Sequence, residues 1–239
     1  MKKLVLTSLV AALGFTAQAN AATPEVSASV SVANTYLFRG VDLGAGSAQV
    51  AGDLIADFGG LYAGTWLSSG DDAFGTEADF FAGYAFDIAD TGISADLGYL
   101  TYVYPTSDIG AGEVAEVYAV LGYAYDDVEL AYSFNFDVSQ DSTLTTGESG
   151  RDWTYMSLSA AVDQFGVLVG YHNDDSAGNG LLHIDGTYAY NDNLAFTVSV
   201  PVDGQDFAVF DDNGVQTGTR NYRDNDPTYV ATLSLPIEF

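Results

Sequence analysis

Apolar and polar residues alternate with a period of two along much of this 239-residue sequence, and this alternation restricts the possible folds more than any other feature. Successive side chains of a β-strand point to opposite faces, so the pattern predicts strands with one apolar and one polar face. About twelve such segments run approximately over residues 25–36, 48–58, 60–68, 77–88, 92–104, 113–125, 127–137, 152–163, 164–172, 181–191, 193–201 and 228–239.

Tight turns and longer connections alternate between these segments. Tight polar turns are predicted at Gly59-Gly60, Asp90-Thr91, Asp126-Asp127, Asp163-Gln164 and 191–193. Longer stretches rich in Gly, Asp and Ser lie near 37–47, 69–76, 105–112, 138–151, 173–180 and 202–227. A transmembrane barrel has this rhythm, because its short turns gather on the side of the termini and its long loops on the other. A soluble β-sandwich needs neither this rhythm nor an apolar face on nearly every strand.

Lipid offers no water to unpaired backbone groups, so a sheet spans a bilayer only when it is closed. The sequence therefore predicts an all-β fold, a single transmembrane antiparallel up-and-down β-barrel of about 12 strands over residues 22–239. Aromatic side chains are expected at both membrane interfaces. The expected outer ring contains Tyr36, Phe38, Trp153 and Tyr171, and the expected periplasmic ring contains Phe58, Phe86, Tyr125, Phe165, Tyr190 and Phe239.

The amino terminus has the features of an export signal. Lys2 and Lys3 precede an uncharged apolar stretch over residues 4–17, and Ala19-Asn20-Ala21 forms a small-x-small cleavage pattern. The stretch is too short to cross a bilayer as a helix, which takes about 20 residues. Residues 1–21 are thus expected to be a cleaved signal peptide, and the mature chain is expected in the outer membrane of a Gram-negative bacterium. The chain has no cysteine, so disulfides cannot stabilise the exported domain.

The charge is strongly acidic, with a formal net charge of −27. Beyond the signal peptide, the basic residues are Arg39, Arg151, Arg220 and Arg223, against 33 acidic residues. This balance argues against nucleic acid as a partner, because phosphate contacts need a basic surface. Disorder is also disfavoured, since 13% of the residues are aromatic and 48% are hydrophobic.

Two motifs carry a resemblance to known proteins. Tyr36-Leu37-Phe38-Arg39-Gly40 is followed by a second predicted strand and by Tyr62-Ala63-Gly64-Thr65-Trp66. This order is similar to the TorF-type porin family, and it covers about the first fifty mature residues. The last segment, which alternates up to Phe239, resembles the signal read by the barrel-assembly machinery. The resemblance implies a small outer-membrane barrel with a channel role, and the assembly machinery as a partner.

The face opposite the apolar one collects carboxylates. The residues expected to line the lumen are Arg39, Asp53, Asp57, Asp79, Asp87, Asp96, Glu116, Glu129, Asp137, Asp163 and Asp185. Such a lumen attracts cations and repels anions, although the same residues can also be wetted interior groups without a selective role. Arg39 is expected to neutralise carboxylates more than to bind a substrate.

Twelve strands fall between barrels filled by side chains and barrels with a wide aqueous channel. A narrow pore is therefore expected, restricted by a folded-in loop or by inward aromatic residues. The inward aromatic residues are Tyr62, Trp66, Phe81, Tyr102 and Tyr118. The Asp-rich stretch 202–227 is one candidate for a loop that plugs the barrel.

The two histidines of the sequence form a candidate pair. A hairpin centred between Ala177 and Gly178 places His172 opposite His183, and Asp174 and Asp185 follow two residues later on the same face. These four groups suit a divalent metal, and His/Asp groups also occur in hydrolases. The simpler interpretation is a pair of polar rim residues. The sequence carries no nucleophile-elbow, phosphate-loop or dinucleotide motif, so neither an enzyme nor a cofactor is expected.

The sequence favours two functions, and a third, an outer-membrane hydrolase that uses His172 and His183, is also considered. The first is a passive diffusion channel for small cationic or neutral solutes. The second is a non-conducting barrel that acts as a surface-binding or structural protein through its acidic loops. In both, the expected partners are outer-membrane lipid and lipopolysaccharide, whose phosphates would be bridged by divalent cations.

Overall fold

The computed structural model describes residues 24–140, 153–174, 179–203, 207–210, 216–220 and 226–238. The predicted signal peptide and Phe239 lie outside this range, as do Arg151 and Arg223. Among the described residues, no helix is both long and apolar enough to cross a membrane.

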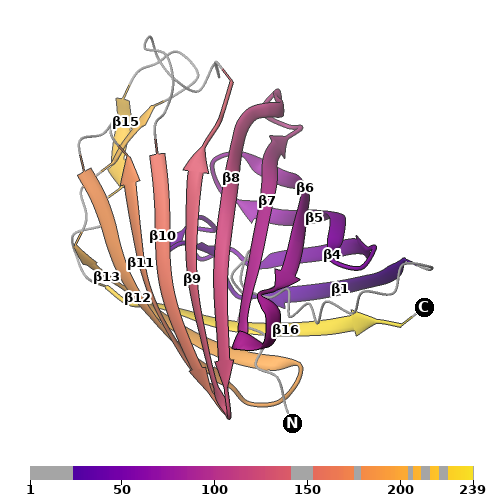
Figure 1. Ribbon diagram of the computed structural model, residues 1–239. Coiled ribbons are helices and arrows are strands. Elements are labelled where there is room, and N and C mark those ends of the chain that lie inside the picture. The colour runs from indigo at the N-terminus through magenta and orange to yellow at the C-terminus, as the bar shows by residue number, and fades with distance from the viewer. Residues whose placement is uncertain are drawn as a thin grey trace.

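Twelve antiparallel strands form one closed barrel (Figure 1). In chain order they are β1 (Glu25–Ala33), β4 (Gln49–Asp57), β5 (Leu61–Asp71), β6 (Gly75–Asp87), β7 (Ile93–Tyr104), β8 (Ile109–Tyr125), β9 (Val128–Asp137), β10 (Trp153–Val162), β11 (Phe165–Asp174), β12 (Asn179–Ala189), β13 (Leu194–Asp203) and β16 (Thr228–Ile237). Each strand pairs with its neighbours along the chain, and β1 pairs with β16 to close the circle. The predicted fold class and strand number are confirmed.

Closure is visible in the register of β1. Val30 lies opposite Gly52 of β4 on one side and opposite Leu235 of β16 on the other. Because both edges of β1 are paired, the ladder of backbone hydrogen bonds continues around the barrel. A sheet of this kind satisfies its backbone groups without water, as a bilayer requires.

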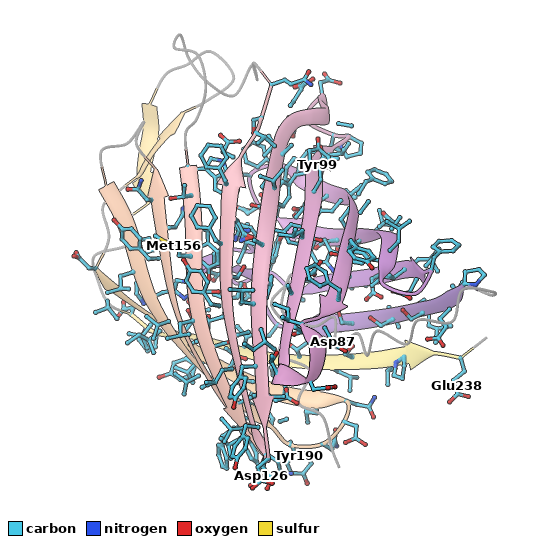
Figure 2. The ribbon with its side chains drawn as sticks, viewed as in Figure 1. Asp87, Tyr99, Asp126, Met156, Tyr190 and Glu238 are labelled. Carbon is cyan, nitrogen blue, oxygen red and sulfur yellow. The ribbon has the colours of Figure 1, made fainter. Side chains whose placement is uncertain are left out.

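The outer face of the barrel is apolar. Along β7, Leu97 and Tyr99 point outward and are 54% and 41% exposed, whereas Leu100 and Tyr102 point inward and are buried. The same alternation holds around the wall, and Figure 2 shows the side chains it places outside. Exposed apolar residues include Val26, Val30, Leu54, Leu61, Leu67, Phe80, Leu121, Leu130, Leu158, Phe165, Val167, Phe196, Leu233 and Ile237. A continuous apolar exterior of this size suits lipid and not water.

Short turns lie at the end of the barrel where β1 starts and β16 finishes. They span residues 58–60, 88–92, 126–127, 163–164 and 190–193, and the second contains the 3-10 turn η1 (Ala89–Thr91). Glu25 pairs with Asp57, next to the first of these turns. Of the six aromatic residues predicted in the periplasmic ring, four point outward here, and their side chains are 53–71% exposed. They are Phe58, Tyr125, Phe165 and Tyr190.

Two connections predicted as long loops are tight hairpins at the other end. The β5–β6 ladder continues to Asp71 opposite Gly75, and the β7–β8 ladder continues to Tyr104 opposite Ile109. Asp71 stabilises its turn by accepting hydrogen bonds from the backbone nitrogens of Ala73 and Phe74, at 2.7 and 2.8 Å. At these two positions the Gly- and Asp-rich composition therefore indicates residues that favour tight turns. It does not indicate a long loop.

The connection between β1 and β4 folds into the barrel. It contains a small hairpin of β2 (Leu37–Phe38) and β3 (Val41–Asp42), which we call the inner hairpin. Its two turn residues, Arg39 and Gly40, have φ values of 48° and 82°, as a two-residue turn of type I′ requires. A second small sheet pairs β14 (Phe207–Phe210) with β15 (Gln216–Arg220), within the stretch predicted as a plugging loop.

Candidate functional site

The interior of the barrel encloses a cavity of about 580 Å³. At one end its lining includes Gln164 and Asn191–Asn193 from the short turns. At the other end its lining includes Tyr36, Phe38 and Arg39, which belong to the inner hairpin or its approach. The cavity therefore runs from the short-turn end of the barrel to the inner hairpin.

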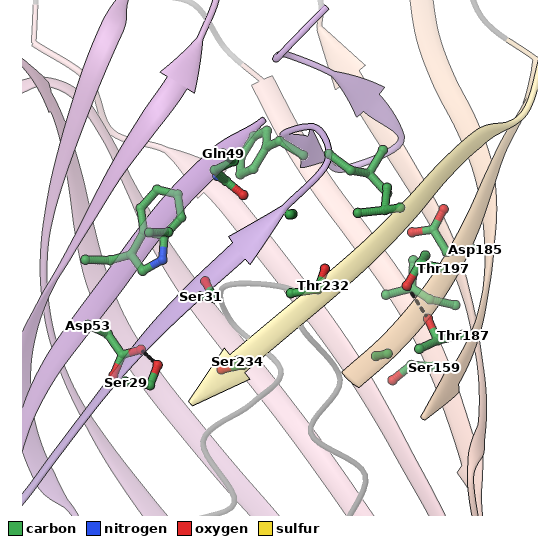
Figure 3. Close-up of a pocket in the computed structure, with 18 of the residues that line it drawn as sticks. Ser29, Ser31, Gln49, Asp53, Ser159, Asp185, Thr187, Thr197, Thr232 and Ser234 are labelled. Atoms are coloured by element: carbon green, nitrogen blue, oxygen red, sulfur yellow. Dashed lines mark hydrogen bonds between the residues drawn. The ribbon is translucent and has the colours of Figure 1, made fainter. Parts of the chain in front are cut away.

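Hydroxyl groups cover much of the cavity wall, because inward positions of several strands carry Ser or Thr. Figure 3 shows Ser29 and Ser31 of β1 beside Thr232 and Ser234 of β16. Nearby, Ser29 donates a hydrogen bond to Asp53. On the adjoining strands β12 and β13, the hydroxyls of Thr187 and Thr197 lie 3.0 Å apart. This side of the cavity offers both donors and acceptors to a polar solute.

Aromatic residues cover the wall formed by β5 to β8. The hydroxyl of Tyr62 donates to Asp96 at 2.7 Å and lies 2.5 Å from the hydroxyl of Tyr118. Phe81 packs against the Tyr62 ring, with the ring centroids 6.3 Å apart. The five inward aromatic residues of the sequence prediction thus point into the barrel, where Trp66, Phe81, Tyr102 and Tyr118 line the cavity.

The inner hairpin narrows the barrel by contacting walls on opposite sides. The Phe38 ring lies 6.2 Å from that of Tyr102 on β7. On the far side, Gly40 faces His183 of β12, and a Cβ atom on Gly40 would lie only 2.4 Å from the His183 ring. The inner hairpin is therefore wedged across the interior. The narrow-pore prediction allowed for a folded-in loop without identifying it, and the inner hairpin is such a loop.

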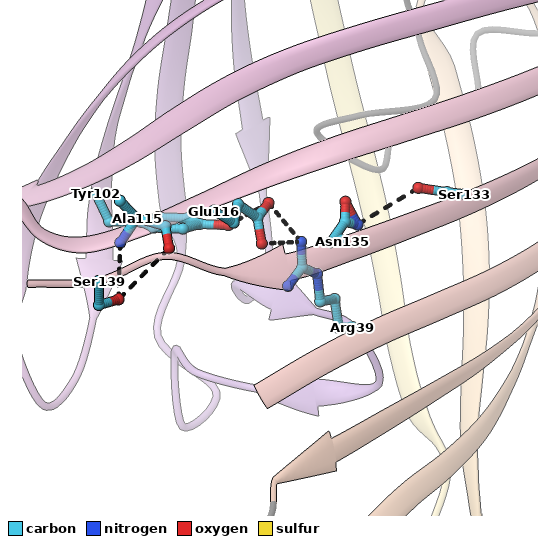
Figure 4. A network of polar contacts seen from close by, with 7 residues as sticks. All are labelled: Arg39, Tyr102, Ala115, Glu116, Ser133, Asn135 and Ser139. Atoms are coloured by element: carbon cyan, nitrogen blue, oxygen red, sulfur yellow. Dashed lines mark hydrogen bonds and ion pairs between the residues drawn. The ribbon is translucent and has the colours of Figure 1, made fainter. Parts of the chain in front are cut away.

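Arg39 anchors the turn of the inner hairpin (Figure 4). Its Nη2 atom donates to both carboxylate oxygens of Glu116 on β8, at 2.8 and 2.9 Å. The guanidinium carbon also lies 5.2 and 4.5 Å from the ring centroids of Trp153 and Tyr155 on β10, and 4.7 Å from that of Phe38. These distances are within the range of cation–π attraction.

This environment stabilises the charged form of the Arg39 guanidinium group. Burial by itself lowers the pKa of the Arg39 guanidinium, but the attraction of Glu116 outweighs burial, and the pKa lies above its usual value. Glu116 is fully buried. A buried ion pair of this kind costs about 3–5 kcal/mol to break by removing one partner, because the remaining charge is left uncompensated.

A second contact holds the chain just before the inner hairpin. The hydroxyl of Tyr36 donates to Glu77 of β6 at 2.9 Å, and the Tyr36 ring lies 5.8 Å from that of Trp66. Glu77 was missed in the sequence, although it is in phase with the predicted lumen residue Asp79. Both carboxyl groups are buried, at 1% and 0% exposure.

Three aromatic residues predicted in the outer ring lie inside the barrel instead. Tyr36 and Trp153 are 5% and 8% exposed, and Phe38 lines the cavity. Trp153 shares the inward face of β10 with Tyr155, which alternation alone could have shown. Tyr36 and Phe38 turn inward because the chain bends after β1, and no local pattern marks that bend. Tyr171 is outward and 38% exposed.

The histidine prediction is corrected in its register. His172 lies opposite Leu181, and His183 lies opposite Gly170. The two histidines keep the same face because the difference is two residues, and Tyr155 lies 6.4 and 6.0 Å from their rings. The side chain of Asp174 lies outside the described residues. Among the residues that the structure describes, no three His, Asp or Glu side chains form a metal site.

His183 instead belongs to a hydrogen-bonded group in the wall. Its Nδ1 atom lies 2.9 Å from Asp185, and its Nε2 atom lies 3.2 Å from the Tyr155 hydroxyl. The Ser199 hydroxyl donates to Asp185 at 2.5 Å. Since its ring is fully buried against the inner hairpin, His183 is a packing partner of that hairpin.

The predicted lumen residues occupy three levels of the barrel. Around the cavity lie Arg39, Asp53, Asp163 and Asp185. Deeper in the wall or near the inner hairpin lie Asp79, Asp96, Glu116 and Asp137. At the short-turn end lie Asp57, Asp87 and Glu129. Those on barrel strands share the inward face, whereas Arg39 and Asp163 lie in turns, and the ion pair among these described residues joins Arg39 and Glu116.

Comparison with solved structures finds barrels of the same kind. A chain described as "NanC porin structure in rhombohedral crystal form" matches with a TM-score of 0.50 and 11% sequence identity, covering 90% of this chain and 99% of that one. A "KdgM porin" matches with a TM-score of 0.47 and 8% identity, again covering 90% and 99%. At these identities the likeness concerns the fold.

Comparison of sequences places the chain in a family. No curated protein is detectably similar to it. Residues 17–193 match the model of a family described as "Bacterial protein of unknown function (Gcw_chp)". Since this match spans most of the chain, the protein belongs to the Gcw_chp family.

Proposed function

We propose that this protein is a porin of the outer membrane of a Gram-negative bacterium, through which small cationic or neutral solutes diffuse passively. One observation carries the proposal: a cavity with carboxylate and hydroxyl groups in its lining lies inside a closed barrel whose outer face is apolar. A lipid-facing exterior around a hydrated interior is the arrangement of transmembrane channels. The similarity of the Tyr36–Gly40 and Tyr62–Trp66 motifs to TorF-type porins supports the same function.

The preference for cations follows from the charges along the cavity. Asp53, Asp163 and Asp185 line it. Among the described lining residues, the basic one is Arg39, and Glu116 already neutralises it. Carboxylates around a narrow path attract cations and repel anions. Neutral solutes are compatible because hydroxyl groups cover much of the remaining wall.

Planar-bilayer recording under a salt gradient tests this function. Purified wild-type protein should insert and conduct, with a reversal potential on the cation-selective side. Replacing Asp53 and Asp185 with Asn should move the reversal potential toward zero. The matched control is Glu129→Gln, because Glu129 is exposed at the short-turn end and does not line the cavity. Anion preference of the wild-type protein would contradict the proposal.

The inner hairpin favours a second candidate function. Its contacts with β7, β8, β10 and β12 occupy the interior at one end of the cavity. A barrel closed in this way would not conduct, and its acidic loops would make it a surface-binding or structural protein. Bilayers that stay sealed with the wild-type protein, and also after the inner hairpin is shortened, would support this second function over the first.

The proposed partners follow from the same features. Lipid contacts the apolar exterior, and divalent cations bridge lipopolysaccharide to the acidic chain. The barrel-assembly machinery is proposed to read the final strand up to Phe239, and residues 1–21 are proposed to direct export. Nucleic acid is not a proposed partner, and no enzymatic activity is proposed.

A further inference from the structure

The barrel wall around Arg39 has the composition of a receptor for a guanidinium group. Glu116 on β8 supplies two carboxylate oxygens, and Trp153 and Tyr155 on β10 supply two aromatic rings. Carboxylates and aromatic faces are the two groups that guanidinium ions favour. All three residues belong to the wall, whereas the guanidinium comes from the inner hairpin. The chain therefore fills this wall site with its own side chain.

Arg39 uses the wall site incompletely. Both of its hydrogen bonds to Glu116 leave from the same nitrogen, Nη2. A guanidinium can present two nitrogens side by side to a carboxylate, which gives a stronger paired contact. The backbone of Arg39 also has a φ of 48°, in the left-handed region that arginine seldom adopts. A free guanidinium group is not held by this turn and can adopt the better orientation.

A further carboxylate next to the wall site lacks a donor. Asp79 is 0% exposed, and neither of its oxygens accepts a hydrogen bond from the part of the chain that the structure describes. It lies on β6 opposite Tyr102, whose hydroxyl donates to Glu116 at 3.0 Å. A guanidinium group carries up to five donors. Arg39 therefore forms no hydrogen bond with the buried Asp79 carboxyl group beside the wall site.

The cavity gives solutes a route to the wall site. Arg39, Tyr102 and Tyr155 all line the cavity that begins at the short-turn end. Asp53, Asp163 and Asp185 along this route attract a cation toward Arg39. A cationic solute that enters the cavity therefore meets the occupied wall site at its far end.

We propose that the wall site of Glu116, Trp153 and Tyr155 binds guanidinium-bearing solutes, and that Arg39 is its built-in competitor. A solute that displaces Arg39 removes the anchor of the inner hairpin. The effect of this displacement on passage through the barrel rests on the proposed channel function. Binding at the wall site itself needs no conduction. The tethered Arg39 has a high local concentration, so displacement in the wild-type protein requires either a higher solute concentration or a solute with additional contacts.

Chemical rescue tests the wall site. Arg39→Gly empties it, and glycine suits the positive φ of this position. In a Trp66→Phe background, Trp153 is the remaining tryptophan of the chain and reports on the wall site by fluorescence. The protein in detergent micelles is titrated with guanidinium chloride against sodium chloride at constant ionic strength. At millimolar guanidinium, we expect a saturable change in Trp153 fluorescence and a higher unfolding temperature. Denaturation by guanidinium would instead lower the unfolding temperature.

Three controls define the result. Urea, the neutral planar relative of guanidinium, should give no saturable change. Glu116→Gln added to Arg39→Gly should weaken guanidinium binding about tenfold or more, since a charged partner is lost. The wild-type protein should need about a hundredfold more guanidinium than Arg39→Gly, because Arg39 competes.

Several outcomes would overturn the inference. Equal responses to guanidinium, urea and sodium in Arg39→Gly would do so, as would binding that ignores Glu116→Gln. If Arg39→Gly folds poorly, its folded yield and that of Arg39→Ala should rise with guanidinium, and unchanged yields would count against the wall site. Binding without any conductance would reject only the channel function, and conductance without binding would reject only the wall site.

Discussion

Arg39 and Gly40 show how two adjacent residues position the whole inner hairpin. Their positive φ values form the turn, the Arg39 side chain reaches Glu116, and the Gly40 backbone lies against His183. Glycine is required at residue 40 for two reasons, the backbone conformation and the absence of space for a Cβ atom. Substitutions in this region should therefore change the stability of the protein through packing against His183 as well as through backbone strain.

Gly40→Ala and Gly46→Ala separate these two causes. Both glycines lie in the β1–β4 connection with similar φ values, 82° and 79°, but a Cβ atom on Gly46 would meet no atom within 4 Å. Gly46→Ala should cost only the backbone strain, about 1 kcal/mol. Gly40→Ala should cost about 1–3 kcal/mol more, because the methyl group overlaps the His183 ring. Urea unfolding in detergent micelles measures the difference, and equal midpoints would contradict the wedged hairpin.

Strands of this barrel are two-sided elements, and the side decides what a substitution does. Leu97 near the middle of β7 faces outward and is 54% exposed, whereas Thr232 of β16 lines the cavity. A charge on the outer face must enter lipid, but a charge on the inner face enters a cavity that already holds carboxylates. The two faces of a strand should therefore tolerate the same substitution very differently.

Leu97→Arg should destabilise the barrel in lipid vesicles by about 2–4 kcal/mol, the cost of an arginine on the lipid face. Thr232→Arg is the comparison, and it should change stability little because the added positive charge enters a cavity lined by acidic residues. Folded fractions across a urea series in vesicles provide the measurement. If Thr232→Arg proves the more damaging of the two, the assignment of faces is wrong.

The inner hairpin crosses the interior of the barrel, and under the proposed channel function it is the constriction. Replacing residues 37–42 with a short Gly-Ser linker removes the contacts to Glu116, Tyr102 and His183. Single-channel conductance should then rise, because the interior is no longer crossed by packed side chains. The same linker placed in the β14–β15 stretch is the control. An unchanged conductance after both replacements would show that the inner hairpin is not the constriction.

At the scale of the whole molecule, stability depends on closure. Every barrel strand has two neighbours, and β1 with β16 completes the circle. Local opening of one strand would expose backbone groups on two sides at once, which is costly in lipid. The barrel is therefore expected to resist unfolding until the closure as a whole is lost.

This closure predicts behaviour in SDS. The folded barrel should stay compact in SDS at room temperature and unfold only on boiling, which shifts its gel mobility. Densitometry of samples heated over a range of temperatures gives the transition. A protein that is soluble without detergent, or that shows one mobility at all temperatures, would contradict a membrane barrel.

The sequence determined the barrel itself, because alternation is a local property. Each strand shows its faces in the order of its own residues, and the rhythm of turns implies antiparallel neighbours and closure. The predicted strands agree with the observed ones to within a few residues, as in the last segment, predicted at 228–239 and observed as Thr228–Ile237. The inward position of Glu116 and Asp53 followed from the same alternation.

The tertiary structure decided what fills the barrel. Pairing of Arg39 with Glu116 joins residues 77 positions apart, and nothing local indicates which of many carboxylates a single arginine will meet. The register of His172 and His183 depended on a turn whose type the sequence left open, so the predicted pair missed by two residues. Tyr36 and Phe38 became interior residues because the β1–β4 connection folds into the barrel, where they meet residues of β6 and β7 that are distant in the sequence.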